Sequence, residues 1–182
     1  MTTSLPSVRA GDSPAEVDAA EPAGHVDAGI GVVEAIHLAA AGSEPMRSVE
    51  SVRAIAGVGL EGDRYATATG TWSTNLKVDR HVTLIEAEEI EALADGRGIQ
   101  LAPGETRRNV TTRGIRLNDL VGRRFRIGAV ECEATRLCEP CQHLTDFLGK
   151  PILEPLVHRA GLRARILGDG EIALGDEVVA LD

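Results

Sequence analysis

The close spacing of strand-like segments constrains the fold of this chain more than any other feature of its sequence. The segments "RRFRIG" (123–128) and "VECEATRL" (130–137) both alternate apolar and polar residues, and a single residue separates them. Alternation with a period of two is typical of a strand, and parallel neighbours need a crossover of a dozen or more residues. We therefore expect a mainly β fold with a few short helices, arranged as a mainly antiparallel barrel or sandwich.

Further segments fit the same scheme. Their residue patterns predict strands over 30–38 ("IGVVEAIHL") and 78–85 ("VDRHVTLI"), whereas 47–55 fits either a strand or a helix. Acidic residues in the first turn and an apolar face predict a helix over 86–95, ended by Gly96. Helices are thus expected to be few and short.

Turn signals mark two other places. The segment "GVGLEGDRY" (57–65) holds three glycines, which predicts a loop or bulge in which Asp63 either caps a turn or shapes the rim of a pocket. Asp169-Gly170 lies between the strand-like segments 162–167 and 171–181. This dipeptide between two such segments predicts a closing hairpin.

Length and composition predict one folded domain. A chain of 182 residues, of which 43% are hydrophobic, is long enough to bury a sizeable core. Residues 1–28 are rich in Pro, Ser, Ala and acids without a hydrophobic period, so we expect a disordered acidic tail before a single domain over 29–182. No secretory signal or membrane span is recognisable, and the cysteine count is odd. We expect a cytoplasmic protein with reduced thiols and no role at a membrane.

The charge pattern limits the partners. A net charge of −9 disfavours nucleic acids, because a phosphate backbone requires a positive face. One segment departs from this balance: seven arginines and a single acid lie between Arg107 and Arg126. The planar guanidinium binds phosphate or carboxylate through paired hydrogen bonds, so this basic segment is a candidate source of donors to an anion.

The three cysteines fall into two groups. Cys132 shares one strand face with Val130 and Ala134, so the pattern predicts a small core residue. Cys138 and Cys141 form a Cys-x-x-Cys spacing in "TRLCEPCQHL", which leaves several interpretations open.

A structural zinc site usually needs two such pairs, and this chain has one. A dithiol redox pair prefers a helix start within a βαβ unit, which an antiparallel fold does not provide. A single reactive thiolate needs positive surroundings and partial exposure, which Arg136, His143 and the basic segment would supply if the fold brings them together. An isolated histidine, such as His143 or His158, more often has a structural or surface role.

A family resemblance now adds to these observations. The segments "GLEGDRY", "VTLIEAEEIEAL", "GETRRNVTT", "LVGRRFRIGAVECEATRLCEPC" and "HRAGLRARILGDGEIALGDEV" follow one another in the order found in the MOSC domain, the module named for the C-terminal domain of molybdenum cofactor sulfurases. The chain resembles small stand-alone bacterial members of this family over about residues 29–182. The resemblance implies a MOSC-type antiparallel β-barrel-like domain that binds molybdenum cofactor, a pterin dithiolene with a phosphate group.

The resemblance also implies site residues. The functional thiol of small members commonly follows a proline, which selects Cys141 in "EPC" as the catalytic cysteine or molybdenum ligand, with Cys138 as its rival. The Arg-x-Asn segment of the family matches Arg107 and Asn109, which are therefore candidate cofactor-binding residues. Arg108, which lies between them, is a third candidate. Arg136 lies just upstream of the cysteines, where family members often carry an arginine.

Three functions are compatible with these residues. In the first, Cys141 accepts a sulfane sulfur as a persulfide and passes it to molybdenum or to a small-molecule acceptor. In the second, Cys141 ligates molybdenum in a reductase of N-hydroxylated compounds, which needs a partner reductase because the sequence has no iron–sulfur or dinucleotide fingerprint. The third is a non-catalytic cofactor carrier. The sulfur donor would be a separate cysteine desulfurase, since neither "NLKVD" nor "LGKP" resembles a pyridoxal phosphate lysine, and we expect no pyridoxal phosphate in this chain.

Overall fold

The computed structural model describes Met1 and residues 29–70 and 79–181. Apart from Met1, the tail expected over 1–28 lies outside the described residues, so its predicted disorder stays a prediction. The described strands are β1 (Ile30–Leu38), β2 (Arg47–Val49), β3 (Ser51–Ile55), β4 (Gly59–Leu60), β5 (Val82–Glu86), β6 (Val110–Arg113), β7 (Arg124–Ile127), β8 (Val130–Leu137), β9 (Leu162–Ile166), β10 (Gly170–Ala173) and β11 (Glu177–Leu181). The helices are α1 (Ala87–Arg97), α2 (Gln142–Leu148) and the short 3-10 turn η1 (Leu117–Leu120).

Seven strands close into a barrel in the order β11-β7-β8-β9-β5-β6-β1, and β1 pairs again with β11. The closing pair includes Ile30 opposite Val179, and β2 extends the sheet from the other end of β1. All these pairings are antiparallel except β5 with β6. The expected mainly β barrel is therefore confirmed, with one parallel pair that makes it mixed. The connection between β5 and β6 contains α1, the crossover that parallel neighbours require.

A second sheet, β10-β3-β4, packs against this barrel, and it corrects one prediction. The strands on either side of Asp169-Gly170 do not form a hairpin: β9 pairs with β8 and β5, whereas β10 pairs with β3. The Asp169 side chain accepts a 2.7 Å hydrogen bond from the backbone N–H of Ala56, just after β3. The turn at Asp169-Gly170 therefore connects β9 of the barrel to β10 of the second sheet.

The ambiguous segment 47–55 is extended, as strands β2 and β3. The predicted helix after β5 is present as α1, but it ends two residues later than expected. Gly96 lies inside it, and Gly98 adopts the left-handed conformation (φ 65°) and donates its N–H to the carbonyl oxygen of Ala94. A glycine in this conformation is the usual end of a helix.

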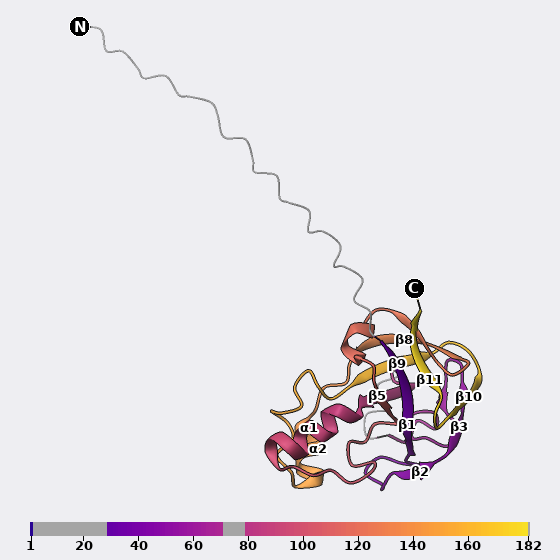
Figure 1. The fold of residues 1–182 in the computed structure, drawn as a ribbon, viewed down its shortest axis with the longest axis horizontal. Coiled ribbons are helices and arrows are strands. Elements are labelled where there is room, and N and C mark those ends of the chain that lie inside the picture. The colour runs from indigo at the N-terminus through magenta and orange to yellow at the C-terminus, as the bar shows by residue number, and fades with distance from the viewer. Residues whose placement is uncertain (2–28, 71–78, 182) are drawn as a thin grey trace.

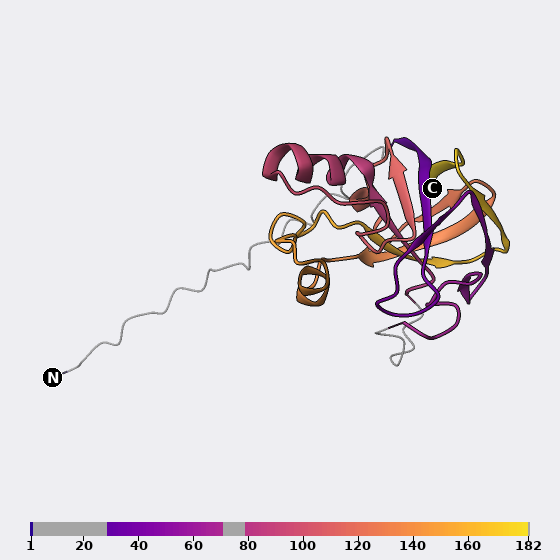
Figure 2. The same cartoon turned by 90° about the horizontal axis from the view of Figure 1, so that it is seen from below.

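Two apolar cores hold these elements. The barrel core consists largely of Val, Leu and Ile side chains around Phe125, and it includes Cys132, whose predicted core position is confirmed. A smaller core joins α1, α2 and the segment before β9, through Leu93, Leu144 and Ile152 with their neighbours. Figures 1 and 2 show both helices on the same side of the barrel. The smaller core thus holds the segment that carries Cys138 and Cys141 against α1.

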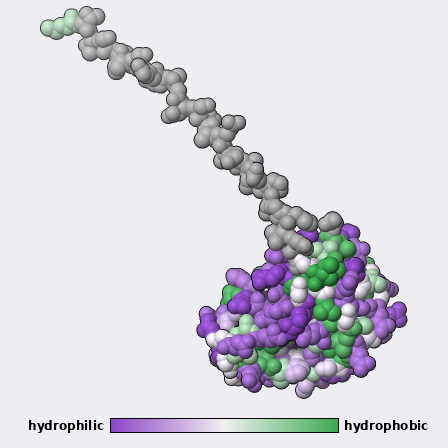
Figure 3. All heavy atoms as spheres, viewed as in Figure 1, coloured by the Kyte–Doolittle hydropathy of each residue, from purple (hydrophilic) through white to green (hydrophobic). Residues whose placement is uncertain are grey.

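The surface resembles that of an ordinary folded domain. On the face shown in Figure 3, hydrophobic residues are interspersed with hydrophilic ones. Among the residues that the structure describes, no helix is both long and apolar enough to cross a bilayer.

Candidate functional site

A cavity of about 310 Å³ opens at one end of the barrel, where β1 and β8 end and β6 and β9 begin. Its walls come from six separate parts of the chain, all of which the barrel brings to this end. The lining residues are Gly42, Ser43, Arg64, Tyr65, Arg80, Arg107, Arg108, Arg136, Cys138, Glu139, Cys141, His143, Leu144, Phe147 and Arg163. Six of these residues are arginines and one is an acid.

The arginines of the cavity agree only partly with the sequence prediction. Arg107, Arg108 and Arg136 were expected, whereas Arg64, Arg80 and Arg163 were not. The basic segment 107–126 does not form one anion-binding surface, because three of its later arginines pair with acids elsewhere. These ion pairs join Arg113 to Glu34 and Glu91, Arg124 to Glu131, and Arg126 to Glu177.

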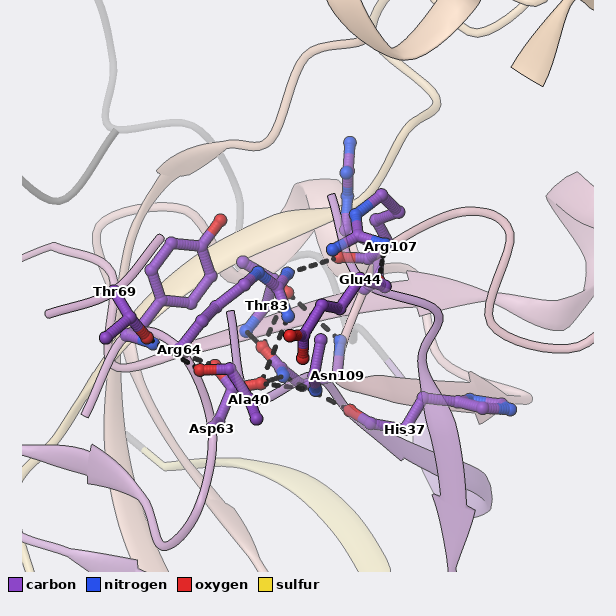
Figure 4. A network of polar contacts seen from close by, with 12 residues as sticks. His37, Ala40, Glu44, Asp63, Arg64, Thr69, Thr83, Arg107 and Asn109 are labelled. Carbon is purple, nitrogen blue, oxygen red and sulfur yellow. Dashed lines mark hydrogen bonds and ion pairs between the residues drawn. The ribbon is translucent and has the colours of Figure 1, made fainter. Parts of the chain in front are cut away.

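Asn109 is not among the residues that line the cavity, and its predicted part in cofactor binding stays a prediction. It is fully buried, and its side-chain oxygen accepts hydrogen bonds from the N–H and hydroxyl of Thr83. Its amide nitrogen donates to the carbonyl of His37 and to Asp63 (Figure 4). Because these bonds occupy both ends of the amide, Asn109 joins β1, β5 and β6.

Asp63 caps a turn, the first of its two predicted roles. Its carboxylate is fully buried and accepts from the backbone N–H groups of Ala39 and Tyr65. It also accepts a 3.1 Å hydrogen bond from Arg64, which in turn donates to the carbonyl oxygen of Arg107 at 3.0 Å (Figure 4). Asp63 therefore fixes Arg64 in the wall of the cavity and is not itself in the lining.

Arg107 has a strained backbone and an incompletely bonded side chain. Its φ is 58°, a left-handed value that is uncommon for a residue with a Cβ. One terminal nitrogen, Nη1, donates to the carbonyl oxygen of Glu44 at 2.6 Å, while the buried Nη2 has no hydrogen-bond partner among the described residues. The guanidinium lies 5.4 Å from the ring centre of Phe147. Burial, together with the nearby charge of Arg64, lowers the pKa of Arg107 from its usual value.

Arg108 supports the cysteine segment. Its guanidinium is buried and donates three hydrogen bonds to backbone carbonyl oxygens: to Ala160 at 2.9 Å, to Thr106 at 3.1 Å and to Cys138 at 2.7 Å. The backbone N–H of Cys138 donates to Gly161 at 2.7 Å. Arg108 therefore links the segments on three sides of the cavity, and its predicted part in cofactor binding stays a prediction.

Two arginines face each other across neighbouring strands of the barrel. Arg136 in β8 lies opposite Arg163 in β9, next to an irregularity in the register of the two strands. Asp79 accepts a 2.6 Å hydrogen bond from Arg136. Burial alone would raise the pKa of Asp79, but the hydrogen bond and charge of Arg136, with the charges of Arg163 and Arg80, hold it below its usual value.

The three cysteines differ sharply in their surroundings. Cys132 is fully buried in the barrel core, and burial raises the pKa of its thiol to about 12, so it is unreactive at neutral pH. Cys138 is buried in the cavity wall, whereas Cys141 is exposed and immediately precedes α2. No disulfide joins them. Of the two cysteines in the motif, Cys141 is therefore the more accessible to a small molecule.

Glu139 and the two nearby histidines bear on the interpretation of the Cys-x-x-Cys pair as a zinc site. Glu139 bonds to the backbone N–H and the ring of His158, which fixes the loop between the cysteines to the following segment. His143 lines the cavity and His158 does not. Within the described ranges, no three His, Cys, Asp or Glu side chains gather in a manner that could hold a metal ion. The geometry therefore provides no support for a zinc site around the Cys-x-x-Cys pair.

The described residues thus form a small closed β-barrel whose end carries a cavity lined by six arginines and an exposed thiol. The MOSC domain model matches residues 63–179, and the chain belongs to this family. The family is associated with molybdenum cofactor.

Solved structures agree on the fold. The chain is similar to the YuaD protein from Bacillus subtilis, with a TM-score of 0.69 and 17% identity over 82% of this chain and 94% of the other. YiiM from Geobacillus stearothermophilus aligns with a TM-score of 0.64 and 17% identity, over 84% of this chain and 75% of that protein. YiiM from Escherichia coli aligns with a TM-score of 0.58 and 16% identity, over 86% and 70%. No curated protein matches the sequence significantly.

Proposed function

We propose that this protein binds molybdenum cofactor in the arginine-lined cavity and uses Cys141 to hold or transfer a sulfane sulfur. The observation that carries the proposal is the placement of an exposed cysteine in the same cavity as six arginines. The family membership supports the cofactor, and the exposed thiol supports the sulfur chemistry.

The donors in the cavity fit such a cofactor. Its phosphate needs fixed positive donors, and Arg107 and Arg163 both carry buried N–H groups without a partner among the described residues. Its sulfur-ligated metal calls for a soft ligand, for which Cys141 is the accessible candidate. When bound, the cofactor would supply a molybdenum centre able to accept sulfur.

Different residues of the chain would then have different roles in sulfur transfer. Cys141, as thiolate, attacks the sulfane sulfur of a donor and becomes a persulfide, while the bond that held this sulfur to the donor breaks and its electron pair leaves with the donor. The arginines hold the anionic groups of the ligand and stabilise the negative charge on the persulfide. Arg108 keeps the cysteine segment in place through the Cys138 carbonyl. A cysteine desulfurase is one class of donor for this step, and the reaction would take place in the cytoplasm.

The exposure of Cys141 equally favours a second function, in which its thiolate ligates molybdenum in a reductase of N-hydroxylated compounds. This role requires a partner reductase as the source of electrons. A carrier that only binds the cofactor would use the same ligation without turnover.

One experiment separates these functions. The protein is expressed with and without molybdenum cofactor biosynthesis, and molybdenum, pterin and cyanide-releasable sulfur are measured per chain for wild type, Cys141→Ser and Cys138→Ser. Sulfur transfer predicts that Cys141→Ser keeps the metal and loses the releasable sulfur. Ligation predicts that the same variant loses the metal. Cys138→Ser is the matched control, since its thiol lies in the same cavity but is buried.

Two results would contradict the proposal altogether. One is stoichiometric zinc together with unfolding of both cysteine variants. The other is a wild-type protein that contains neither molybdenum and pterin nor releasable sulfur when the cofactor is available.

A further inference from the structure

The cavity carries more positive charge than its neighbouring acids neutralise. Arg64 pairs with Asp63, and Arg136 and Arg80 share Asp79. Glu139, the acid in the lining, is bonded to His158. In the part of the chain that the structure describes, the remaining arginines of the cavity make no ion pair: they are Arg107, Arg108 and Arg163.

Several of these positive groups also lack hydrogen-bond acceptors. The buried atoms Nε and Nη1 of Arg163 and Nη2 of Arg107 have no partner among the described residues. A buried donor without an acceptor costs free energy, and native proteins seldom leave one unused. An oxyanion in the cavity would satisfy these donors.

The strand pairing adds a third observation. Arg136 and Arg163 occupy opposite positions on the antiparallel strands β8 and β9. Like charges directly opposite each other destabilise a sheet, and Asp79 supplies one negative charge between two strands that present two positive ones. A dianion beside these arginines would balance the excess.

From these observations we propose that, before the cofactor occupies the cavity, Arg163 and Arg107 form an oxyanion subsite beside Cys141, and that it takes thiosulfate as a sulfur donor. The inference rests on the proposed role of Cys141 as a sulfur carrier and names the class of donor that this role would use. Thiosulfate is a small dianion that carries its transferable sulfur next to three oxygen acceptors. Its charge and its acceptors match the unused donors of the cavity.

The reaction step balances without a further reactant. The Cys141 thiolate attacks the outer sulfur of thiosulfate, a new S–S bond forms at Cys141, and the bond to the oxygen-bearing sulfur breaks. Both electrons of that bond leave with sulfite, so the products are the Cys141 persulfide anion and a sulfite dianion. The arginines would stabilise the charge that develops on the departing sulfite.

The test uses the full chain produced without molybdenum cofactor biosynthesis. Thiosulfate is added, released sulfite is measured, and the chain is examined by mass spectrometry for the gain of one sulfur atom at Cys141. We expect one sulfite per chain, dependence on Cys141, and competition by inorganic sulfate. Loss of the charge-assisted bonds in Arg163→Gln should raise the half-saturating thiosulfate concentration roughly tenfold.

The matched control is Arg165→Gln on the same strand. Arg165 pairs with Glu133 and does not line the cavity, so this variant should retain the wild-type half-saturating concentration. The rate of alkylation of Cys141 by iodoacetamide, which is uncharged, should fall in Arg163→Gln by much less than the tenfold change in half-saturating concentration. This measurement separates an effect on anion binding from a disturbed thiol.

Three outcomes would overturn the inference. These are the absence of sulfite release, sulfite release that persists in Cys141→Ser, and half-saturating thiosulfate concentrations that are equal in wild type and Arg163→Gln. If the chain fails with thiosulfate but gains persulfide sulfur from a cysteine desulfurase, the donor inference fails and the proposed function stands. If no donor places sulfur on Cys141, the sulfur-carrier function fails as well.

Discussion

The guanidinium of Arg108 donates a 2.7 Å hydrogen bond to the carbonyl oxygen of Cys138 and thereby ties the cysteine segment to the start of β6. The two residues are thirty positions apart in the chain. The contact fixes the backbone of the cysteine motif and leaves the Cys141 thiol exposed.

Replacing Arg108 with methionine should destabilise the fold. The substitution leaves three carbonyl oxygens without their buried donor, and we expect a loss of about 3 kcal/mol in the free energy of unfolding. Urea denaturation measures this loss, and labelling of Cys138 in the native protein should accelerate. The control Arg97→Met removes an exposed ion pair with Glu154 and should change stability by less than about 0.5 kcal/mol. Equal stabilities for the two variants would contradict the proposed role of Arg108.

Gly161 should tolerate no side chain. Its φ is 93°, and a Cβ there would lie 1.8 Å from the carbonyl oxygen of Leu84, so Gly161→Ala must displace backbone. We expect a loss above about 3 kcal/mol in the free energy of unfolding, or failure to fold. The control is Gly149→Ala, where φ is 63° but no atom lies within 4 Å, and there we expect about 1 kcal/mol. A Gly161→Ala protein as stable as Gly149→Ala would show that this close approach is absent.

Removing the carboxylate of Asp79 should strengthen anion binding. Asp79→Asn leaves Arg136 and its neighbours without their negative partner, so sulfate should bind about threefold or more tightly at low ionic strength. Salt screens this effect, and the difference should shrink as sodium chloride is added. Titration calorimetry with sulfate provides the measurement, and Asp95→Asn on the exposed surface of α1 serves as the control. Unchanged or weaker binding would place the anion away from these arginines.

Glu86 should make the stability depend on pH. Burial raises the pKa of this carboxyl above its usual value, although its Oε1 accepts a 2.7 Å hydrogen bond from the N–H of Leu117. The folded state therefore holds the proton more tightly than the unfolded state, and this group reduces stability as the pH rises above about 4.3, its unfolded pKa. Glu86→Gln removes this dependence, so its stability relative to wild type should improve between acidic and neutral pH. Urea denaturation across that range checks the sign, and a relative loss towards neutral pH would contradict it.

The sequence was a good guide to features set by local pattern. Alternation located β7 and β8, and the same alternation placed Cys132 in the core, while the residue pattern of 30–38 located β1. Such a pattern depends on which face of a strand is buried and does not depend on which strand pairs with it. The parallel pairing of β5 with β6 was missed, although the helix between them had been predicted.

The composition of the cavity depends on distant pairings and was only partly predictable. Arg163 alternates with buried residues in β9, a pattern that is equally typical of an arginine facing solvent. Only the pairing of β9 with β8 places it opposite Arg136, and nothing in either segment specifies that register. The reverse holds for Arg113, Arg124 and Arg126, which are close in sequence but pair with acids elsewhere. Clustering along the chain was therefore a poor measure of clustering in space.

The pairing of Ile30 with Val179 sets an order of events during synthesis. β1 pairs with β2 and β6, but its first residues acquire their partner β11 only when the last strand has emerged, because a chain is made from its N-terminus. Until then β1 has an open edge, and Arg163 reaches the cavity only after both cysteines have been made. A growing chain thus carries the thiol before its positive surroundings are complete.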